Sequence, residues 1–275
     1  MTENRALPMG FGSRAVLAVA TVGGLFMFCW PLLVNTAPAV TAQQAQAPFI
    51  FVAVLPVLVL LVIAQLSEGG LDSKALAMLG VLSAINAALR PLGAGTAGIE
   101  LVFFLLILAG RVFGPGFGFL LGCTSLFASA LLTAGVGPWL PFQMLAAAWI
   151  GMGAGLLPGR LFGRDIRGWP EIVLLSGFGI VAAYAFGLLM NLSYWPFAVS
   201  PGFEANAGLA YVAGAPVAEN LDHFVVFTLL TSTAGWDTGR AITNVVAIVL
   251  LGPAVLAVLR RAARRARFVS PSHIG

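Results

Sequence analysis

Residues 135–157 read GVGPWLPFQMLAAAWIGMGAGLL. A turn broken by glycine and proline carries Trp139, and the apolar helix that follows has Gln143 in its first turn. The rest of this helix has no charged residue and is rich in glycine and alanine. Lipid is as apolar as leucine, so helices in a membrane associate largely through close packing of such small residues. The stretch therefore predicts a membrane helix whose first turn faces a ligand and whose small residues face other helices.

The composition of the whole chain supports a membrane protein. Of the 275 residues, 60% are hydrophobic and 9% are charged, whereas soluble domains have about 25% charged residues. A spanning helix needs about 20 mostly apolar residues, and the sequence supplies such runs repeatedly. We expect an all-α polytopic membrane protein with spans at Ala15–Val34, Pro48–Leu66, Ala75–Leu89, Ile99–Phe113, Gly116–Ala134, Pro138–Leu157, Glu171–Met190 and Thr238–Leu259.

The basic residues predict the orientation of these spans. With a cytoplasmic amino terminus and every span crossing, 12 of the 14 lysine and arginine residues fall in cytoplasmic segments, leaving only Arg90 and Arg240 outside. A crossing at Leu221–Leu230 would move the five tail arginines outside, so we expect that short piece to be an external or re-entrant helix. Both termini are then cytoplasmic. The basic tail is interpreted as a topology signal, and no nucleic-acid partner is expected.

The first span has an alternative interpretation as a cleaved signal peptide. Basic residues precede it, and Ala45-Gln46-Ala47 resembles a cleavage site. Its apolar run is longer than the roughly 7–15 residues of a signal core, which favours a retained helix.

Several chemistries lack their sequence signatures. The chain has no G-x-x-x-x-G-K-[ST] loop, no H-E-x-x-H, no G-x-S-x-G and no cluster of Cys and His at metal-ligand spacing. Cys29 and Cys123 lie inside apolar runs, where packing is a better interpretation than a disulfide. We expect no catalytic residue, no metal site and no cofactor. The charges near the spans are predicted at span ends, which argues against an ion-coupled carrier; they are Arg90, Glu100, Arg111, Glu171, Asp237 and Arg240.

Three series of small residues recur every four positions, on one helix face each. They are Gly80/Ala84/Ala88, Gly110/Gly114/Gly118/Gly122 and Gly151/Gly155/Gly159. Internal packing is the favoured interpretation of the two glycine series. For the first series, internal packing and docking of a partner stay open.

From Leu76 onward, five motifs occur in a recognisable order: LAMLGVLSAINAALR, GRVFGPGFGFLLG, GPWLPFQMLAAAWIGMGAGLL, MNLSYWPF and NVVAIVLLGPAVLAVLRR. Together they resemble the substrate-binding S component of energy-coupling factor (ECF) vitamin transporters, in particular the branch associated with cobalamin-type and queuosine-type substrates. The resemblance implies a six-helix substrate-binding core in residues 69–267, preceded by two additional transmembrane helices in 1–68 and followed by a tail, 268–275.

The resemblance also implies function and partners. It implies a bacterial cell membrane, a solute pocket near the outer face, and a transport subunit rather than an enzyme. The implied partners are a transmembrane coupling subunit and two ABC-type ATPases, with a small-residue surface that docks on the coupling subunit; Gly80, Ala84 and Ala88 are the matching positions. Two extra spans, a long segment from Ser193 to Trp236, and TGRAITN in place of a histidine-containing stretch depart from the pattern. Cobalamin-like, queuosine-like and smaller vitamins therefore stay open as substrates.

The external helix ends supply the candidate substrate-binding residues. Aromatic walls with a few convergent amides and charges suit a flat, polar-rimmed vitamin. The candidates are Asn86, Arg90, Trp139, Gln143, Tyr184, Asn191, Trp195, Asp237 and Arg240.

Simpler roles remain open for some of these candidates. The tryptophans suit a membrane interface, Arg90 suits a pair with Glu100, and Asp237 suits a helix N-cap. Rival functions are a self-sufficient secondary carrier, a membrane-embedded enzyme and a structural assembly subunit.

Overall fold

The computed structural model describes residues 11–33, 73–93, 98–137, 139–197, 208–212 and 214–267. The predicted second span, Pro48–Leu66, and the tail 268–275 lie outside these residues, as does the suggested cleavage site. Nearly all of the described part is helical, which confirms the all-α class; one pair of two-residue strands is the exception.

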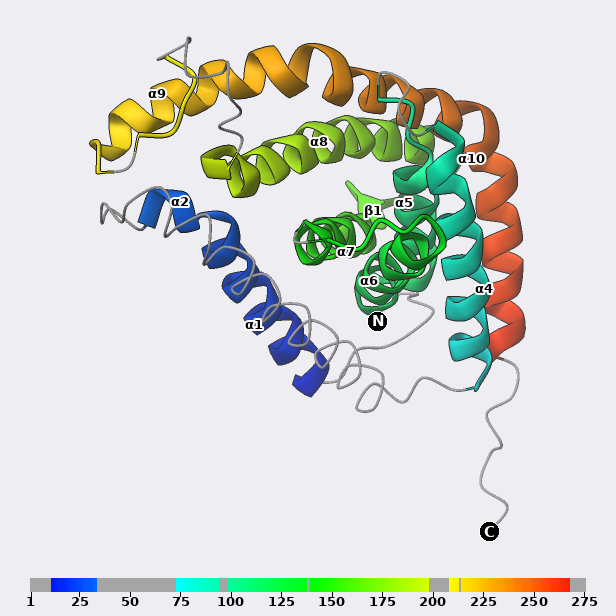
Figure 1. Cartoon of the computed structure of the whole chain (residues 1–275). Coiled ribbons are helices and arrows are strands. Elements are labelled where there is room, and N and C mark those ends of the chain that lie inside the picture. The colour runs from blue at the N-terminus through cyan, green and yellow to red at the C-terminus, as the bar shows by residue number, and fades with distance from the viewer. Residues whose placement is uncertain are drawn as a thin grey trace.

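The order of the helices along the chain can be followed in Figure 1. They are α1 (Phe11–Phe28), α2 (Trp30–Leu33), α4 (Ser73–Leu89), α5 (Val102–Phe113), α6 (Pro115–Leu132), α7 (Leu140–Leu156), α8 (Trp169–Tyr194), α9 (Val217–Thr228) and α10 (Thr238–Arg267). Short helical turns are η1 (Arg90–Gly93) and η2 (Trp195–Phe197), and η4 (Leu229–Asp237) is a π-helix. The strands β1 (Arg160–Leu161) and β2 (Arg164–Asp165) form an antiparallel hairpin between α7 and α8.

Four helical stretches of the described part are long and apolar enough to cross a membrane. They are Ser73–Gly93, Pro115–Leu132, Trp169–Tyr194 and Val217–Arg265. The apolar helices α1, α5 and α7 are shorter. These seven stretches fall on seven of the eight predicted spans.

The carboxyl-terminal helix differs from the prediction. Helices α9, η4 and α10 run as one continuous helix from Val217 to Arg265, which arches across the top of Figure 1 and then turns down its right side. The break predicted between Leu230 and Thr238 is therefore wrong. The residues between the predicted short helix Leu221–Leu230 and the span from Thr238 fold as π-helix, which keeps the chain helical. Pro253 lies inside α10 and removes a backbone hydrogen bond, which allows the helix to curve.

The glycine series hold α5, α6 and α7 together in the middle of the bundle. A methyl group on Gly118 of α6 would collide with the backbone of Gly151 on α7, and one on Gly122 would collide with Ala148. Gly110 of α5 approaches the carbonyl of Gly151 equally closely. The prediction of internal packing is confirmed for these positions, whereas Gly159 faces open space.

Helix α5 is buried on nearly every side, and its phenylalanines fill the space between the neighbouring helices. Phe103 packs edge-on against Phe186 of α8, with ring centroids 4.8 Å apart. Phe113 and Phe117, on either side of the α5–α6 turn, lie 4.6 Å apart. Such a helix, apolar all round, belongs at the centre of a membrane bundle.

Helix α1 covers one side of this bundle and is part of the fold. The Phe28 ring lies 5.1 Å from that of Phe142 and 5.5 Å from that of Trp149, both on α7. Cys29 and Cys123 are both free thiols, and Cys123 is fully buried, as the packing interpretation predicts.

Replacing Gly118 by alanine should lower the thermal stability of the detergent-solubilised protein. The added methyl group has to push the α7 backbone away, at a cost of about 1–3 kcal/mol. The matched control is Gly177→Ala on the exposed face of α8, where a methyl group meets open space. Equal melting temperatures for the two variants would contradict the close α6–α7 contact.

Candidate functional site

The predicted site residues converge mainly at one end of the bundle, where α4 ends and α5 and α7 begin. Gly98, just before α5, has a φ of 81° and lies against the backbone of Trp236 and Arg240. A side chain at this position would both clash and strain the backbone, so glycine allows the loop to touch the carboxyl-terminal helix. This contact brings the start of α5 to the charged residues of α10.

One group of polar side chains joins α4, α6 and α7. Arg90 donates from Nη2 to Oε1 of Gln143 over 2.7 Å. One turn earlier on α4, the fully buried Asn86 donates from Nδ2 to Oγ of Ser125 over 3.0 Å. The Asn86 Oδ1 atom is buried and has no hydrogen-bond partner in the structure. This group therefore retains an unused acceptor as well as the remaining donors of the Arg90 guanidinium.

A second group, the Arg240 cluster, joins the segment before α5 to η4 and α10 and consists of Arg240, Glu100, Asp237 and Ser232. Arg240 donates from Nε to Glu100 Oε2 over 2.6 Å and from Nη1 to Asp237 Oδ1 over 2.7 Å. Ser232 donates to the other Asp237 oxygen over 2.7 Å. Asp237 is 1% exposed and Arg240 9%, so these are buried charges that need one another.

Aromatic rings and a glycine shape the Arg240 cluster. The guanidinium carbon of Arg240 lies 4.9 Å from the ring centroid of Phe186 and 5.5 Å from that of Phe103, a cation–π arrangement. Gly187 of α8 lies directly against the Asp237 carboxylate, where any side chain would collide. One turn away, the Tyr184 hydroxyl shares a 2.9 Å hydrogen bond with Thr238.

The two groups act on each other electrostatically. Glu100 forms its ion pair with Arg240 and attracts Arg90 through space. The alternative in which Arg90 simply pairs with Glu100 is therefore not what the structure shows. Arg90 bonds Gln143, and Glu100 pairs with Arg240. The N-cap alternative for Asp237 is wrong, because Asp237 lies inside a continuous helix. The expectation that Asp237 and Arg240 lie at a span end stays a prediction, because Val217–Arg265 is much longer than the roughly 20 residues that one crossing needs.

Three further candidates lie apart or have incomplete contacts. Asn191 of α8 has a buried Nδ2 without a partner in the structure. Trp139 is 45% exposed. Trp195 is 1% exposed and donates from Nε1 to the Leu209 carbonyl over 2.8 Å. The structure therefore places Trp195 in a small core of its own rather than among the charged groups.

The small core around Trp195 joins α8, α9 and the segment before α9. The Trp195 ring lies 5.2 Å from Tyr211 and 5.4 Å from Phe224. Burial raises the pKa of the Tyr211 phenol, whose hydroxyl donates to the Pro31 carbonyl over 3.2 Å. The core thus ties the end of the amino-terminal helices to the carboxyl-terminal helix.

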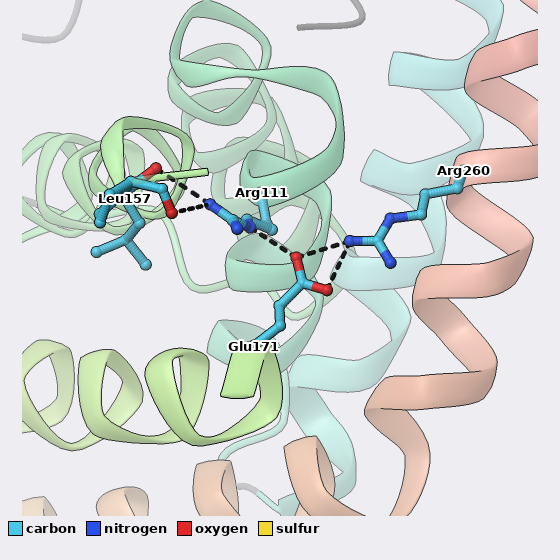
Figure 2. Close-up of polar contacts among 5 residues, drawn as sticks. Arg111, Leu157, Glu171 and Arg260 are labelled. Atoms are coloured by element: carbon cyan, nitrogen blue, oxygen red, sulfur yellow. Dashed lines mark hydrogen bonds and ion pairs between the residues drawn. The ribbon is translucent and has the colours of Figure 1, made fainter. Parts of the chain in front are cut away.

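The opposite ends of α5, α7, α8 and α10 meet at a buried carboxylate, shown in Figure 2, which we call the Glu171 clamp. Glu171 is 1% exposed and accepts from Arg111 Nε over 2.8 Å and from Arg260 Nη2 over 2.6 Å. Arg111 also donates from Nη1 to the carbonyls of Leu157 and Pro158, over 3.1 and 3.0 Å. The clamp satisfies free carbonyls at the end of α7 and fixes four helices to one another.

The small residues of α4 do not pack against any other part of the chain that the structure describes. Gly80, Ala84 and Ala88 are all exposed, and a methyl group on Gly80 would meet open space. The opposite face of α4, which includes Leu79 and Leu82, is buried. The bundle uses its other small-residue faces for close packing and leaves this one free.

Some residues of the site carry no signal in the sequence. Gly187 and Phe186 are ordinary residues of an apolar helix, and Ser125 is one of several serines. Their roles arise from contacts between distant segments. Glu100 was recognised as a charge near a span and as a partner for Arg90, but its ion pair with Arg240 was not predicted.

A scan of protein-family models gives a match over more than half of the chain: the family described as ECF transporter, substrate-specific component, matches residues 74–234. No curated protein and no solved structure matches the chain. The matched region begins in α4 and includes the Arg90–Gln143 group, the exposed face of α4, and Glu171 and Arg111 of the Glu171 clamp, whereas Arg260 and the Arg240 cluster's arginine lie beyond it.

Replacing Arg240 by glutamine should destabilise the protein strongly. The change leaves Glu100 and Asp237 close together without their cation, and breaking a buried pair in this way costs about 3–5 kcal/mol. Thermal melting in detergent measures the effect, with Arg160→Gln as the control because Arg160 and Asp165 form an exposed pair. Adding Asp237→Asn to Arg240→Gln should restore part of the loss. A wild-type melting temperature for Arg240→Gln would contradict the buried cluster.

Proposed function

The chain belongs to the family of substrate-specific components of ECF transporters, and we propose that it is the solute-binding subunit of an ATP-driven importer for a vitamin-like micronutrient. As a family member it is a multi-pass transport subunit of a membrane. A bacterial cell membrane with both termini in the cytoplasm is part of the proposal, supported by the placement of the arginines.

The observation that carries the proposal is a pair of incompletely bonded buried amides, Asn86 one turn before Arg90 and Asn191 one turn beyond Gly187 on α8. Asn86 Oδ1 and Asn191 Nδ2 are buried without partners, and a buried amide without a partner is costly. A solute that bonds them would remove that cost and would be held firmly. At the other end, the Glu171 carboxylate has both oxygens bonded, which makes it a poor place for a ligand.

The residues also indicate the chemistry of the solute. The Arg90 guanidinium and the Gln143 amide present donors and an acceptor near the start of α7, and Phe103 and Phe186 add aromatic surfaces around Arg240. A flat molecule with an apolar body and a polar rim fits such a lining. The motif resemblance suggests a cobalamin-type or queuosine-type solute, with smaller vitamins as further candidates.

We propose that α4 docks on a transmembrane coupling subunit through Gly80, Ala84 and Ala88. Small residues let two helix backbones approach closely in lipid, and here they are exposed and unused. Two ABC-type ATPases would supply the energy, consistent with the lack of a P-loop in this sequence.

The proposed cycle begins with capture of the solute at the outer face. In this proposal the loop around PLGAGTAG and the segment from Ser193 to Trp236 close over the bound solute. The loaded subunit then reorients when the ATPase-driven coupling subunit engages α4. In this cycle the chain binds the solute, and its partners supply the energy that releases the solute into the cytoplasm.

A secondary carrier is the rival that a specific observation favours. Asp237 and Arg240 are buried inside the long helix, and ionisable residues within spans often mark ion paths. In this chain both are fully engaged with each other, Glu100 and Ser232. A structural role accounts for these contacts, so the carrier remains second.

Gln143→Ala and Asn191→Ala should each weaken solute binding by about tenfold or more, because each removes a hydrogen bond of roughly 1.5–3 kcal/mol if its partner is charged. The solute that co-purifies with the protein, identified by mass spectrometry, provides the ligand for calorimetry. Thr133→Ala, an exposed site at the same end, is the control. Unchanged affinity in both amide variants would remove this site.

Ala84→Trp should abolish transport by the complete complex while leaving solute binding intact. The bulky ring holds the α4 surface away from another helix. The control is Gly177→Trp, on an exposed position of α8 with open space around it. Uptake in cells and calorimetry on the purified subunit separate the two steps. Normal uptake by Ala84→Trp would show that the face has no docking role.

A further inference from the structure

The hairpin between α7 and α8 has an unusual turn. Arg160 pairs with Asp165 and Leu161 with Arg164, so Phe162 and Gly163 form a two-residue loop. Both loop residues have positive φ, 50° and 78°. Two positive values identify the type I′ turn that joins twisted strands, and its favoured sequence is Asn-Gly.

Phe162 is poorly suited to this position by local preference. An aromatic residue in the left-handed region is a genuine outlier, because its Cβ crowds the backbone. Phe162 is also 95% exposed, so packing within the chain does not compensate for the conformation. A large apolar side chain held outward against its backbone preference points to a function at the surface.

Basic residues surround this exposed ring. Arg160 donates to Asp165 over 2.7 Å, and this bond lowers the pKa of the Asp165 carboxyl. Arg164 and Arg167 are exposed and form no ion pair within the described residues. The hairpin thus presents uncompensated positive charge together with apolar surface, to which Leu161, 54% exposed, and Trp169, 65% exposed, contribute.

The hairpin is held in a defined place. The Ile166 amide donates to the Gly159 carbonyl over 2.9 Å, and Ile166 itself is buried. At the hairpin's base, the carbonyls of Leu157 and Pro158 accept from Arg111 within the Glu171 clamp (Figure 2). Helix α8, a candidate membrane span, begins directly after it. The loop tip is therefore fixed close to the end of a spanning helix, the level at which lipid headgroups lie.

We propose that this hairpin is an anchor that binds an anionic membrane surface. Phe162 and Leu161 insert among the headgroups, and Arg164 and Arg167 bind the phosphates of anionic phospholipids. Aromatic residues favour the membrane interface, and arginine matches phosphate in charge and geometry. The occupant is lipid rather than a protein partner, because the tip adjoins a span and its two free arginines complement an anionic leaflet.

The test uses the full chain in lipid nanodiscs of phosphatidylcholine with or without phosphatidylglycerol. Hydrogen exchange of the backbone in residues 159–168 should slow when phosphatidylglycerol is present. Native mass spectrometry of the detergent-solubilised chain should show binding of phosphatidylglycerol over phosphatidylcholine. Arg164→Gln with Arg167→Gln should reduce that preference by about fivefold for each arginine.

Phe162→Asn separates the anchor from a purely local role. Asparagine suits the turn better than phenylalanine, so the hairpin should fold at least as well, while protection by lipid falls. The control is Arg14→Gln with Lys74→Gln, which removes two exposed charges from α1 and α4.

Each of three results would overturn the proposal. These are protection that does not depend on phosphatidylglycerol, an equal loss of lipid preference in the Arg14/Lys74 control, and protection that appears only when a partner protein is added. The last result would assign the hairpin to a protein interface.

Discussion

Close contact between helix backbones at glycine is the constraint on which the structure depends. Apolar burial alone does not drive helices together in lipid, so α5, α6 and α7 rely on Gly110, Gly118 and Gly151 to approach closely. The small-residue faces of α5, α6 and α7 are therefore buried against one another. The face of α4 at Gly80, Ala84 and Ala88 has the same character but remains exposed. Because the described helices do not cover this face of α4, another helix could pack against it.

The two ends of the bundle differ in how completely their polar groups are satisfied. At the Glu171 clamp, one carboxylate bonds two arginines, and one of these also bonds free carbonyls of α7. At the other end, the Arg240 cluster is well bonded, but Asn86 Oδ1, one turn before Arg90, and Asn191 Nδ2, one turn beyond Gly187, are buried without partners. This difference supports the proposal that the solute binds at the end with the unpartnered amides.

The sequence was informative where a pattern is local. The apolar runs predicted the spans, and the four-residue stride of Gly118 and Gly122 predicted the packed face. The continuous helix from Val217 to Arg265 was missed, because the residues between Leu230 and Thr238 have no apolar pattern and pack against distant segments, at Gly98 before α5 and Gly187 of α8. Pairing within the site was equally hidden, since Arg90 and Gln143 are 53 residues apart. Which of several polar groups pair is decided by packing between distant segments.

The central claim is that this chain binds a solute but takes the energy for transport from other proteins. The most direct measurement is solute accumulation in liposomes that contain only the purified chain, loaded with its co-purifying solute. The account predicts solute binding without accumulation, and accumulation only after the coupling subunit, the ATPases and ATP are added. Steady uptake by the chain alone, without ATP, would contradict it.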